Sequence, residues 1–162
     1  MTNQLWLEKI KYMIDEAVRL LQENEPDEGY FLAFSGGKDS VFTRYIVELS
    51  GVKHQAYFNR TSVDQPEMIR FIKKHYPNTT HLKPKRTMFQ LIVQKRILPT
   101  RIRKHCCEHL KHYAGKGRCI ITGIRADESH KRAERNMIEG DKYNESKRYI
   151  HPIFYCNELD VW

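Results

Sequence analysis

A six-residue segment of the chain has the composition of a phosphate-binding loop. It lies between a short apolar run, residues 30–34, and a segment with helical apolar spacing, residues 41–49, and it consists of Ser35, Gly36, Gly37, Lys38, Asp39 and Ser40. Glycines let a backbone come close to an anion, and the N–H groups and positive dipole end of a following helix attract it. We therefore expect phosphate binding here, with a purely structural turn as the alternative.

Three side chains of this loop carry the expected chemistry. Lys38 would bring a positive charge to the phosphates and is a candidate catalytic residue. Asp39 is a candidate ligand of a Mg²⁺ ion held on the phosphates, and Asp39 and Ser40 are candidates to cap the helix. A Walker A loop has Gly-Lys followed directly by Ser or Thr, whereas Lys38 is followed by Asp39. The segment is therefore a different kind of phosphate loop.

A second polar cluster follows the apolar run 118–124 and contains Arg125, Glu128, Ser129 and Arg132. Arginine presents a planar fork that suits bidentate binding to phosphate or sulfate. A ligand-binding role is therefore expected for this cluster. The alternative is a solvated group of ion pairs.

Two adjacent cysteines, Cys106 and Cys107, stand next to a basic run, residues 103–105. Positive neighbours at a helix start favour a reactive thiolate. Cys106 with His109, or His105 with His109, would also share a helix face, but the spacing matches no standard zinc pattern. Packing, redox or sulfur chemistry, and metal or cluster ligation all stay open for the pair.

The remaining cysteines and the histidines give weaker signals. Cys119 lies in an apolar run and is expected in the core, and Cys156 indicates nothing. The eight histidines show no carboxylate at a telling spacing. Surface or loop positions are expected for them.

The elements that must position these residues alternate between strand-like and helix-like patterns. Strands are expected at residues 30–34, 52–59, 79–83, 118–124 and 148–154, and helices at 4–23, 41–49, 67–76 and 88–97, with a mobile loop at 134–147. Strands separated by helices predict a mainly parallel, doubly wound sheet in three α/β/α layers. We expect one domain, residues 1–162, in which 1–29 are an N-terminal helix and loop, and a ligand at the carboxyl ends of the strands.

Composition narrows the class of partner. The formal charge of +8 indicates a polyanionic partner, namely a nucleotide, a sulfonucleotide or a nucleic acid. The basic runs 83–86 and 101–104 favour the nucleic acid. With no signal-like N-terminus and no membrane-length apolar run, a cytoplasmic protein without membrane contact is expected.

Four blocks in order, from about residue 30 to 162, resemble the phosphoadenosine phosphosulfate (PAPS) reductase family within the ATP pyrophosphatase superfamily. The first is the loop 35–40. The others are Arg-x-x-Cys-Cys-x-x-Leu-Lys at 103–111, Gly-x-Arg-x-x-Glu-Ser-x-x-Arg at 123–132, and His-Pro-Ile at 151–153 with Asp-Val-Trp at 160–162. The family includes sulfonucleotide reductases, the small subunit of bacterial ATP sulfurylase and DNA phosphorothioation enzymes.

The resemblance implies an adenine nucleotide α-hydrolase-like, Rossmann-like fold that binds ATP or a sulfonucleotide (PAPS or APS) with Mg²⁺. The loop 35–40 would hold the β- and γ-phosphates, and Gly123 would lie at the nucleotide. Lys111, Arg125 and Arg132 would supply charge, and Arg125 and Arg132 would be catalytic together with Lys38. Glu128 and Ser129 would orient those arginines or the ion. The chemistry would be attack at the α-phosphorus with release of pyrophosphate, by positioning and charge neutralisation.

The chain also departs from the family pattern. Sulfonucleotide reductases carry a nucleophilic cysteine in a C-terminal tail, and those with a 4Fe–4S cluster add a distant Cys-x-x-Cys that Cys106 and Cys107 lack here. We therefore expect no cluster and no reductase activity from this chain alone. The chain is expected to be a truncated or minimal member, and its intact loop favours ATP.

Three functions follow as hypotheses. The first is an adenylyltransferase, ATP pyrophosphatase or sulfonucleotide reductase-type enzyme of sulfur metabolism. The second uses the same ATP chemistry to install sulfur in tRNA or DNA, and the third is a non-catalytic nucleotide-binding adaptor. A homodimer or a partner chain is compatible with all three.

Overall fold

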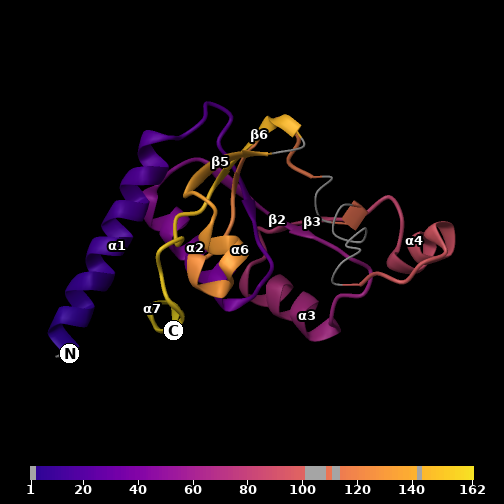
Figure 1. Cartoon of the computed structure of the whole chain (residues 1–162), viewed down its shortest axis with the longest axis horizontal. Helices are drawn as coiled ribbons and strands as arrows, with labels where there is room; N and C mark the ends of the chain where they lie inside the picture. Colours follow the sequence, from indigo (N-terminus) through magenta and orange to yellow (C-terminus); the bar gives the residue numbers. More distant parts are fainter. Residues whose placement is uncertain (1–2, 101–108, 111–113, 142–143) are drawn as a thin grey trace.

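The computed structural model describes residues 3–100, 109–110, 114–141 and 144–162. In this described part the strands form one six-stranded sheet with the order β3-β2-β1-β4-β6-β5 (Figure 1). All neighbouring strands are parallel except β5 and β6, which are antiparallel. The mainly parallel α/β sheet predicted from the sequence is confirmed, and the strand order reverses between β1 and β4.

The strands lie close to the predicted positions where the sequence is apolar. They are β1 (Tyr30–Ala33), β2 (His54–Asn59), β3 (Thr80–Leu82), β4 (Cys119–Ile121), β5 (Ile138–Asp141) and β6 (Asn144–Ile150).

The helices also follow the predicted order. They are α1 (Asn3–Glu23), α2 (Lys38–Ser50), α3 (Pro66–His75), α4 (Met88–Lys95), the 3₁₀ turn η1 (Ala126–Glu128), α6 (His130–Ala133) and α7 (Glu158–Val161). Pro66 occupies the first turn of α3, as expected from its fixed φ. In Figure 1, α1 runs along one side of the molecule, with α7 near it, and α4 projects at the other end.

One face of the sheet carries the main hydrophobic core. Alternate strand residues share a face, and the register places Leu32 of β1 beside Ala56 and Ile121. These side chains are buried in one cluster with residues of α1, α2 and α3. The Tyr30 hydroxyl, at the start of β1, donates a hydrogen bond of 2.8 Å to the Leu21 carbonyl of α1. The three helices therefore cover this face.

The opposite face of the sheet is lined by aromatic and aliphatic side chains. The register puts Phe31 of β1, Ile120 of β4 and Tyr149 of β6 in one row. The ring of Phe31 stacks on Tyr57 of β2, with 4.1 Å between centroids and 8° between planes. This row forms the floor of the cavity described below.

The segment predicted as a mobile loop, residues 134–147, is largely an antiparallel edge of the sheet. Here β5 pairs with β6, with Ile138 opposite Ile150 and Glu139 opposite Tyr149. An edge hairpin can expose one face to water, so its sequence lacks the continuous apolar run of a buried parallel strand. The loop prediction was therefore wrong, because polarity was taken as a sign of disorder.

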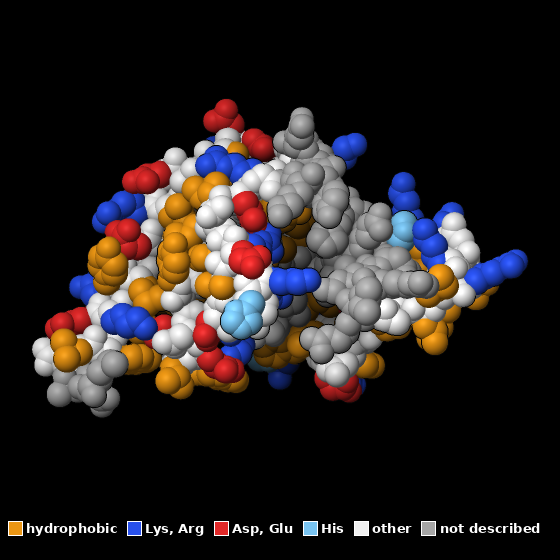
Figure 2. Space-filling view, in the orientation of Figure 1, with side chains coloured by type: hydrophobic (Ala, Val, Ile, Leu, Met, Phe, Trp, Pro, Cys, Tyr) orange, Lys and Arg blue, Asp and Glu red, His pale blue; other side chains and the backbone are white. Residues whose placement is uncertain are grey.

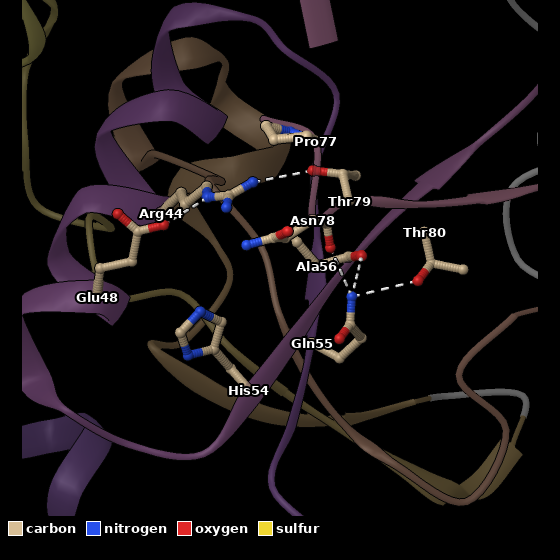
Figure 3. Close-up of a pocket in the computed structure, with 9 residues that line it drawn as sticks. All are labelled: Arg44, Glu48, His54, Gln55, Ala56, Pro77, Asn78, Thr79 and Thr80. Atoms are coloured by element: carbon tan, nitrogen blue, oxygen red, sulfur yellow. Dashed lines mark hydrogen bonds and ion pairs between the residues drawn. The ribbon is translucent and has the colours of Figure 1, made fainter. Parts of the chain in front are cut away.

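A hollow of about 610 Å³ opens at the amino-terminal edge of β2 and β3, between α2 and the end of α3 (Figure 3). Its polar side chains already bind one another. Arg44 donates to Glu48 at 2.7 Å and to Thr79 at 2.9 Å, and Gln55 donates to the Asn78 carbonyl at 2.8 Å. This hollow lies at the edge of the sheet away from the loop 35–40, so it is not part of the candidate site.

Charge is unevenly spread over the surface. Lys and Arg side chains project around the end of the molecule where α4 lies (Figure 2). The exposed basic residues of this region are Lys83, Lys85, Arg86, Lys95 and Arg96. In the described residues we find no helix with the length and apolar character needed to cross a membrane.

Candidate functional site

The loop 35–40 turns sharply from β1 into α2. Gly36 has φ +78°, and a Cβ added there would lie 2.5 Å from Sδ of Met68 and 3.1 Å from Cγ1 of Ile72, both on α3. Glycine is therefore required for the backbone angle and for the close packing against α3. The loop is held against the helix that follows β2.

Gly37 is the N-cap residue of α2, and no described side chain caps this helix. The first N–H groups of a helix have no partner within it. They therefore point out of the helix start with the positive end of its dipole. A helix start of this kind can bind an anion, and anion binding by this loop stays a prediction from the sequence.

Asp39 and Ser40 do not cap the helix, contrary to the expectation, because α2 already begins at Lys38. The Ser40 hydroxyl instead donates to the Gly37 carbonyl at 2.8 Å and accepts from the backbone N–H of Ser35 at 3.3 Å. The Ser35 and Ser40 hydroxyl oxygens are 3.1 Å apart. The two serines thus close the loop from inside.

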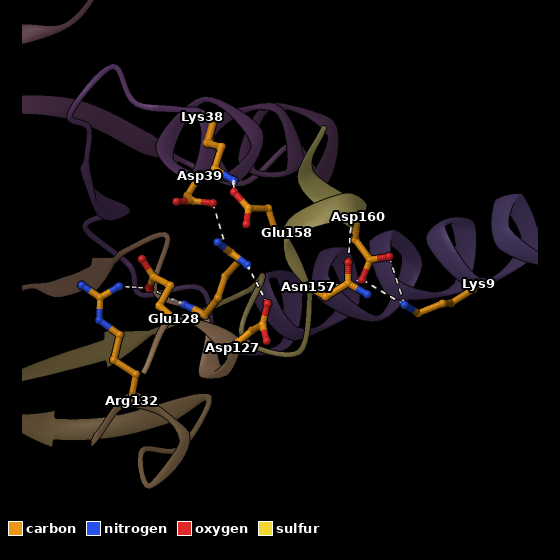
Figure 4. Close-up of polar contacts among 10 residues, drawn as sticks. Lys9, Lys38, Asp39, Asp127, Glu128, Arg132, Asn157, Glu158 and Asp160 are labelled. Carbon is orange, nitrogen blue, oxygen red and sulfur yellow. Dashed lines mark hydrogen bonds and ion pairs between the residues drawn. The ribbon is translucent and has the colours of Figure 1, made fainter. Parts of the chain in front are cut away.

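Asp39 is held by a buried arginine (Figure 4). Arg125 Nε donates to Oδ1 of Asp39 at 2.9 Å, and Nη1 of Arg125 lies 3.6 Å from Oδ2 of Asp127. Only 6% of the Arg125 side chain is exposed. Arg125 Nη1 has no hydrogen-bond partner among the described residues. In this position Arg125 contacts the loop through Asp39 and lies behind it.

Glu128 links the two arginines of the second cluster. Its Oε2 accepts from the backbone N–H of Arg125 at 3.1 Å and forms an ion pair with Arg132. Burial lowers the pKa of Arg132, and the neighbouring Arg135 lowers it further, yet a guanidinium stays charged at neutral pH. Ser129 is exposed and serves as the N-cap residue of α6.

Lys38 contacts the C-terminal helix. Its Nζ lies 2.7 Å from Oε1 of Glu158 and 5.1 Å from the ring centroid of Trp162. The hydrogen bond from Lys38 lowers the pKa of Glu158. Helix α7 is itself anchored to α1, because Lys9 Nζ lies 2.9 Å from Oδ2 of the buried Asp160. The loop lysine is therefore paired with a carboxylate from the other end of the chain.

A cavity of about 660 Å³ lies beside the loop, at the carboxyl ends of β1, β2 and β4. Its apolar wall includes Phe31, Tyr57, Ile120 and Tyr149. Gly123 also lines it, and its polar residues are Ser35, Asp39, Ser40, Asn59, Thr61, Asp64, Gln65, Thr122, Glu128, Arg132 and Lys147. The cavity thus has an aromatic wall, together with residues of the loop and with acidic and basic side chains.

Gly123 brings the end of β4 against the start of α2. A Cβ at this position would lie 2.8 Å from Oγ1 of Thr43 and 2.9 Å from the Asp39 carbonyl oxygen. A side chain would therefore separate β4 from the loop. Gly123 keeps the two predicted clusters next to each other.

The sequence analysis missed a buried histidine that contacts Thr122, a residue of the cavity lining. The Oγ1 atom of Thr122 is 2.7 Å from Nδ1 of His151, and Nε2 of His151 is 2.8 Å from Oε1 of Glu139. His151 is fully buried. The only signal was its place in the His-Pro-Ile block, since its carboxylate partner lies in the segment predicted as a loop.

The protonation of this group follows from its surroundings. Burial lowers the pKa of His151, and this outweighs the hydrogen bond to Glu139, which raises it. Burial raises the pKa of Glu139, but hydrogen bonds from Arg135 and His151 outweigh burial and leave that pKa below its ordinary value. At neutral pH the histidine is therefore neutral and the glutamate ionised.

A buried lysine was also missed. Lys147 of β6 lines the cavity and is only 4% exposed. A lysine in a cavity wall adds positive charge for an anionic ligand. It could not be assigned from the sequence because it was placed in the predicted loop.

The cysteine predictions are tested only in part. Cys106 and Cys107 lie outside the described residues, as does Lys111. Cys119 and Cys156 are buried, as expected for the first of them. Burial raises the pKa of the Cys156 thiol to about 11, so this thiol stays protonated and unreactive.

Comparison with known proteins gives a family and a fold. Residues 29–162 match the family model of the phosphoadenosine phosphosulfate reductase domain. FMN adenylyltransferase of Candida glabrata, solved in complex with ATP, is similar in structure with a TM-score of 0.63 and 12% identity over 97% of this chain and 54% of that chain. Yeast FAD synthetase in complex with FAD gives a TM-score of 0.60 and 13% identity over 97% of this chain and 58% of that chain.

The chain thus spans little more than half the length of these solved structures. No curated protein matches it in sequence. At 12–13% identity the structural likeness shows the fold alone, whereas the family match covers most of the chain. The chain is therefore a member of the phosphoadenosine phosphosulfate reductase domain family, and its α/β fold is similar to that of these solved structures.

Proposed function

We propose that this protein binds ATP in the cavity beside the loop 35–40 and catalyses attack on its α-phosphorus, with release of pyrophosphate. The observation that carries the proposal is the uncapped start of α2 at the edge of the cavity, beside the Asp39–Arg125 pair and Arg132. Helix N–H groups and charged side chains there face one space that an extended anion can fill. Family membership supports the same ligand class.

The cavity suits a nucleotide in size and in polarity. Its volume of about 660 Å³ lies within the roughly 300–1,000 Å³ common for small-molecule sites. The base would lie against Phe31, Tyr57, Ile120 and Tyr149, where aromatic faces offer stacking. The triphosphate would then extend toward the loop and Arg132.

A magnesium ion would be held jointly by the protein and the ligand. Among the described residues no group of three or more His, Cys, Asp or Glu is placed to bind a metal. Mg²⁺ commonly keeps several waters and binds one or two carboxylates together with substrate phosphates. Asp39 lines the cavity and is oriented by Arg125, so it fits the role of that carboxylate. The ion would neutralise phosphate charge.

The residues of the site would act mainly by positioning and by charge. The N–H groups of the loop, Lys38 and Arg132 would stabilise the negative charge that develops on the departing pyrophosphate. Arg125 would hold Asp39 in place. For Lys38 to reach a phosphate, it must exchange Glu158 for the ligand.

The acceptor is the finer part of the proposal. We infer an acceptor linked to sulfur metabolism, because the family match is to a sulfonucleotide-processing domain. A nucleic acid is the second candidate, and the observation in its favour is the group of exposed basic residues around α4. Phosphate contacts by such residues make binding fall steeply with salt. If the protein binds neither tRNA nor DNA at low salt, this candidate is excluded.

The proposal is tested by ATP binding and by pyrophosphate release. Wild type is compared with a Lys38→Ala, Asp39→Ala double variant and with Lys11→Ala, which removes an exposed lysine of α1. ATP at 100 times its dissociation constant should raise the free energy of unfolding by about 2.7 kcal/mol in wild type and in the control. The double variant should lose this gain.

Two outcomes would change the assignment. Unaltered ATP binding by the double variant would contradict the site. ATP binding without pyrophosphate release, with any acceptor tried, would leave the non-catalytic adaptor as the function.

A further inference from the structure

Thr122, His151 and Glu139 form a hydrogen-bonded chain that runs from the cavity into the protein. Thr122 follows β4 and lines the cavity, His151 follows β6, and Glu139 lies in β5. The two contacts measure 2.7 Å and 2.8 Å, and His151 has no exposed surface. Its inner end is fixed by Arg135, which pairs with Glu139.

The chemistry of the three groups sets the direction of each hydrogen bond. An ionised carboxylate only accepts, so Nε2 of His151 must carry the proton that Glu139 receives. In a neutral imidazole the other nitrogen is then an acceptor, so Nδ1 receives the hydroxyl proton of Thr122. Oγ1 of Thr122, a residue that lines the cavity, therefore has only lone pairs left for a further partner. It suits an O–H or N–H donor and is unsuited to a phosphate oxygen.

The surroundings of His151 keep it in this state. The charged groups that act on the ring are Arg135 and Glu139. The rings of Tyr149 and Phe154 lie near the imidazole, each with its centroid 6.4 Å from that of His151. Because the ring has no surface exposed to water, its single N–H proton has no ready route from one nitrogen to the other.

We propose that Thr122 is a subsite for a hydrogen-bond donor of the bound nucleotide, a ribose hydroxyl or the adenine amino group, with His151 and Glu139 as its positioning residues. This inference rests on the proposed nucleotide site. The loop 35–40 presents donors that select phosphate oxygens, and Thr122 presents an acceptor that selects the nucleoside. The two ends of the cavity would therefore fix the direction in which the nucleotide binds.

The test is a matrix of ligands and variants followed by titration calorimetry. The ligands are ATP and three analogues. 2′-Deoxy-ATP and 3′-deoxy-ATP each lack one ribose hydroxyl, and inosine triphosphate has a carbonyl in place of the adenine amino group. The variants are Thr122→Val, which keeps the shape without the hydroxyl, and Thr122→Ser, which keeps the hydroxyl. One neutral hydrogen bond is worth about 1 kcal/mol, or roughly fivefold in affinity.

Wild type and Thr122→Ser should bind ATP about fivefold more tightly than the one analogue that lacks the contacted donor. Thr122→Val should lose this preference while it binds that analogue as wild type does. Equal weakening of all four ligands in Thr122→Val would overturn the subsite and leave a structural role. Failure of wild type to bind any of the four would instead overturn the nucleotide site itself, and the subsite with it.

A second pair of variants tests the positioning role of His151. In His151→Asn the amide oxygen can take the place of Nδ1 and accept from Thr122, whereas His151→Leu offers no acceptor. The preference for ATP should persist in His151→Asn and vanish in His151→Leu, with thermal unfolding as the check on folding. Loss in both variants, with both folded, would contradict the positioning role, and the Thr122 variants decide the subsite even if a His151 variant does not fold.

Discussion

At the scale of single residues, the site depends on groups that act through one another. Arg125 is almost fully buried and contacts Asp39, so it serves the loop by orienting a carboxylate. Thr122 is held in the same way by His151. Removing one member of such a pair leaves the other desolvated and unpartnered, which costs more than the contact itself contributes.

Asp39→Ala should destabilise the protein by about 2 kcal/mol, because among the described carboxylates it leaves the buried guanidinium of Arg125 with the more distant Asp127. Urea unfolding measures the change. Asp127→Ala is the matched control, since this carboxylate is 57% exposed and lies 3.6 Å from Arg125, and it should cost less than about 1 kcal/mol. Equal losses in the two variants would contradict the importance of the Asp39 pair.

Stability should fall as the pH is lowered below about 6.5, because burial holds the pKa of His151 below that of an unfolded histidine. In that range the unfolded chain binds a proton that the folded protein does not, so stability rises with pH. The further loss from Glu139, whose pKa also lies below its ordinary value, comes only below about pH 4.5.

The measurement is the free energy of unfolding between pH 7.5 and 5 for wild type and His151→Asn. Burial, Arg60 and Lys73 also lower the pKa of His81, so the two slopes are compared with each other. His151→Asn should flatten the slope by at most about 1.4 kcal/mol per pH unit. An unchanged slope would show that His151 is the charged imidazolium in the folded protein as well as in the unfolded chain.

At the scale of elements, the loop is held between two helices that are distant in sequence. Helix α3 packs under Gly36, and α7 places Glu158 against Lys38. The contact with α3 fixes the backbone of the loop, and the ion pair with Glu158 neutralises the charge of Lys38. A phosphate bound by Lys38, as we propose for ATP, would therefore have to compete with Glu158 of α7.

Gly36→Ala should destabilise the protein more than Gly51→Ala does. Both glycines have a positive φ, which costs a side chain about 1–2 kcal/mol, but only Gly36 lacks room for a Cβ. The loss of stability in Gly36→Ala beyond that in Gly51→Ala measures the packing of the loop against α3. ATP binding should weaken in Gly36→Ala and stay unchanged in Gly51→Ala. Thermal unfolding and calorimetry measure the two effects. Equal destabilisation would mean that Met68 and Ile72 move aside without cost.

Glu158→Gln should strengthen ATP binding, because Lys38 no longer has to leave a carboxylate. The pair is exposed on the Glu158 side, so the gain should be modest, roughly two- to fivefold. Glu67→Gln, which removes an exposed partner of Arg70, is the control and should leave the affinity unchanged. Weaker binding in Glu158→Gln would show that α7 orients Lys38 for the ligand.

At the scale of the whole molecule, the sheet gathers the site from distant segments. The loop follows β1 and the Arg125 cluster follows β4, and these strands are neighbours where the order of the sheet reverses. Ligands of open α/β sheets bind at such reversals. The β5–β6 hairpin then adds Glu139 and Lys147 from the far edge.

The sequence by itself determined the strand–loop–helix unit at residues 30–50, the mainly parallel sheet and the family, because apolar periodicity and contiguous motifs are local properties of the chain. It also placed Arg125, Glu128 and Arg132 after the right strand. Only the tertiary structure decided that Arg125 lies behind Asp39 and that α7 pairs with Lys38. Only the tertiary structure also showed that Thr122, His151 and Glu139 contact one another. Thr122 follows β4, His151 follows β6 and Glu139 lies in β5, so no single motif contains all three. The physical reason is that strand pairing sets these contacts, and the hairpin that supplies Glu139 is polar in sequence because it stands at an edge.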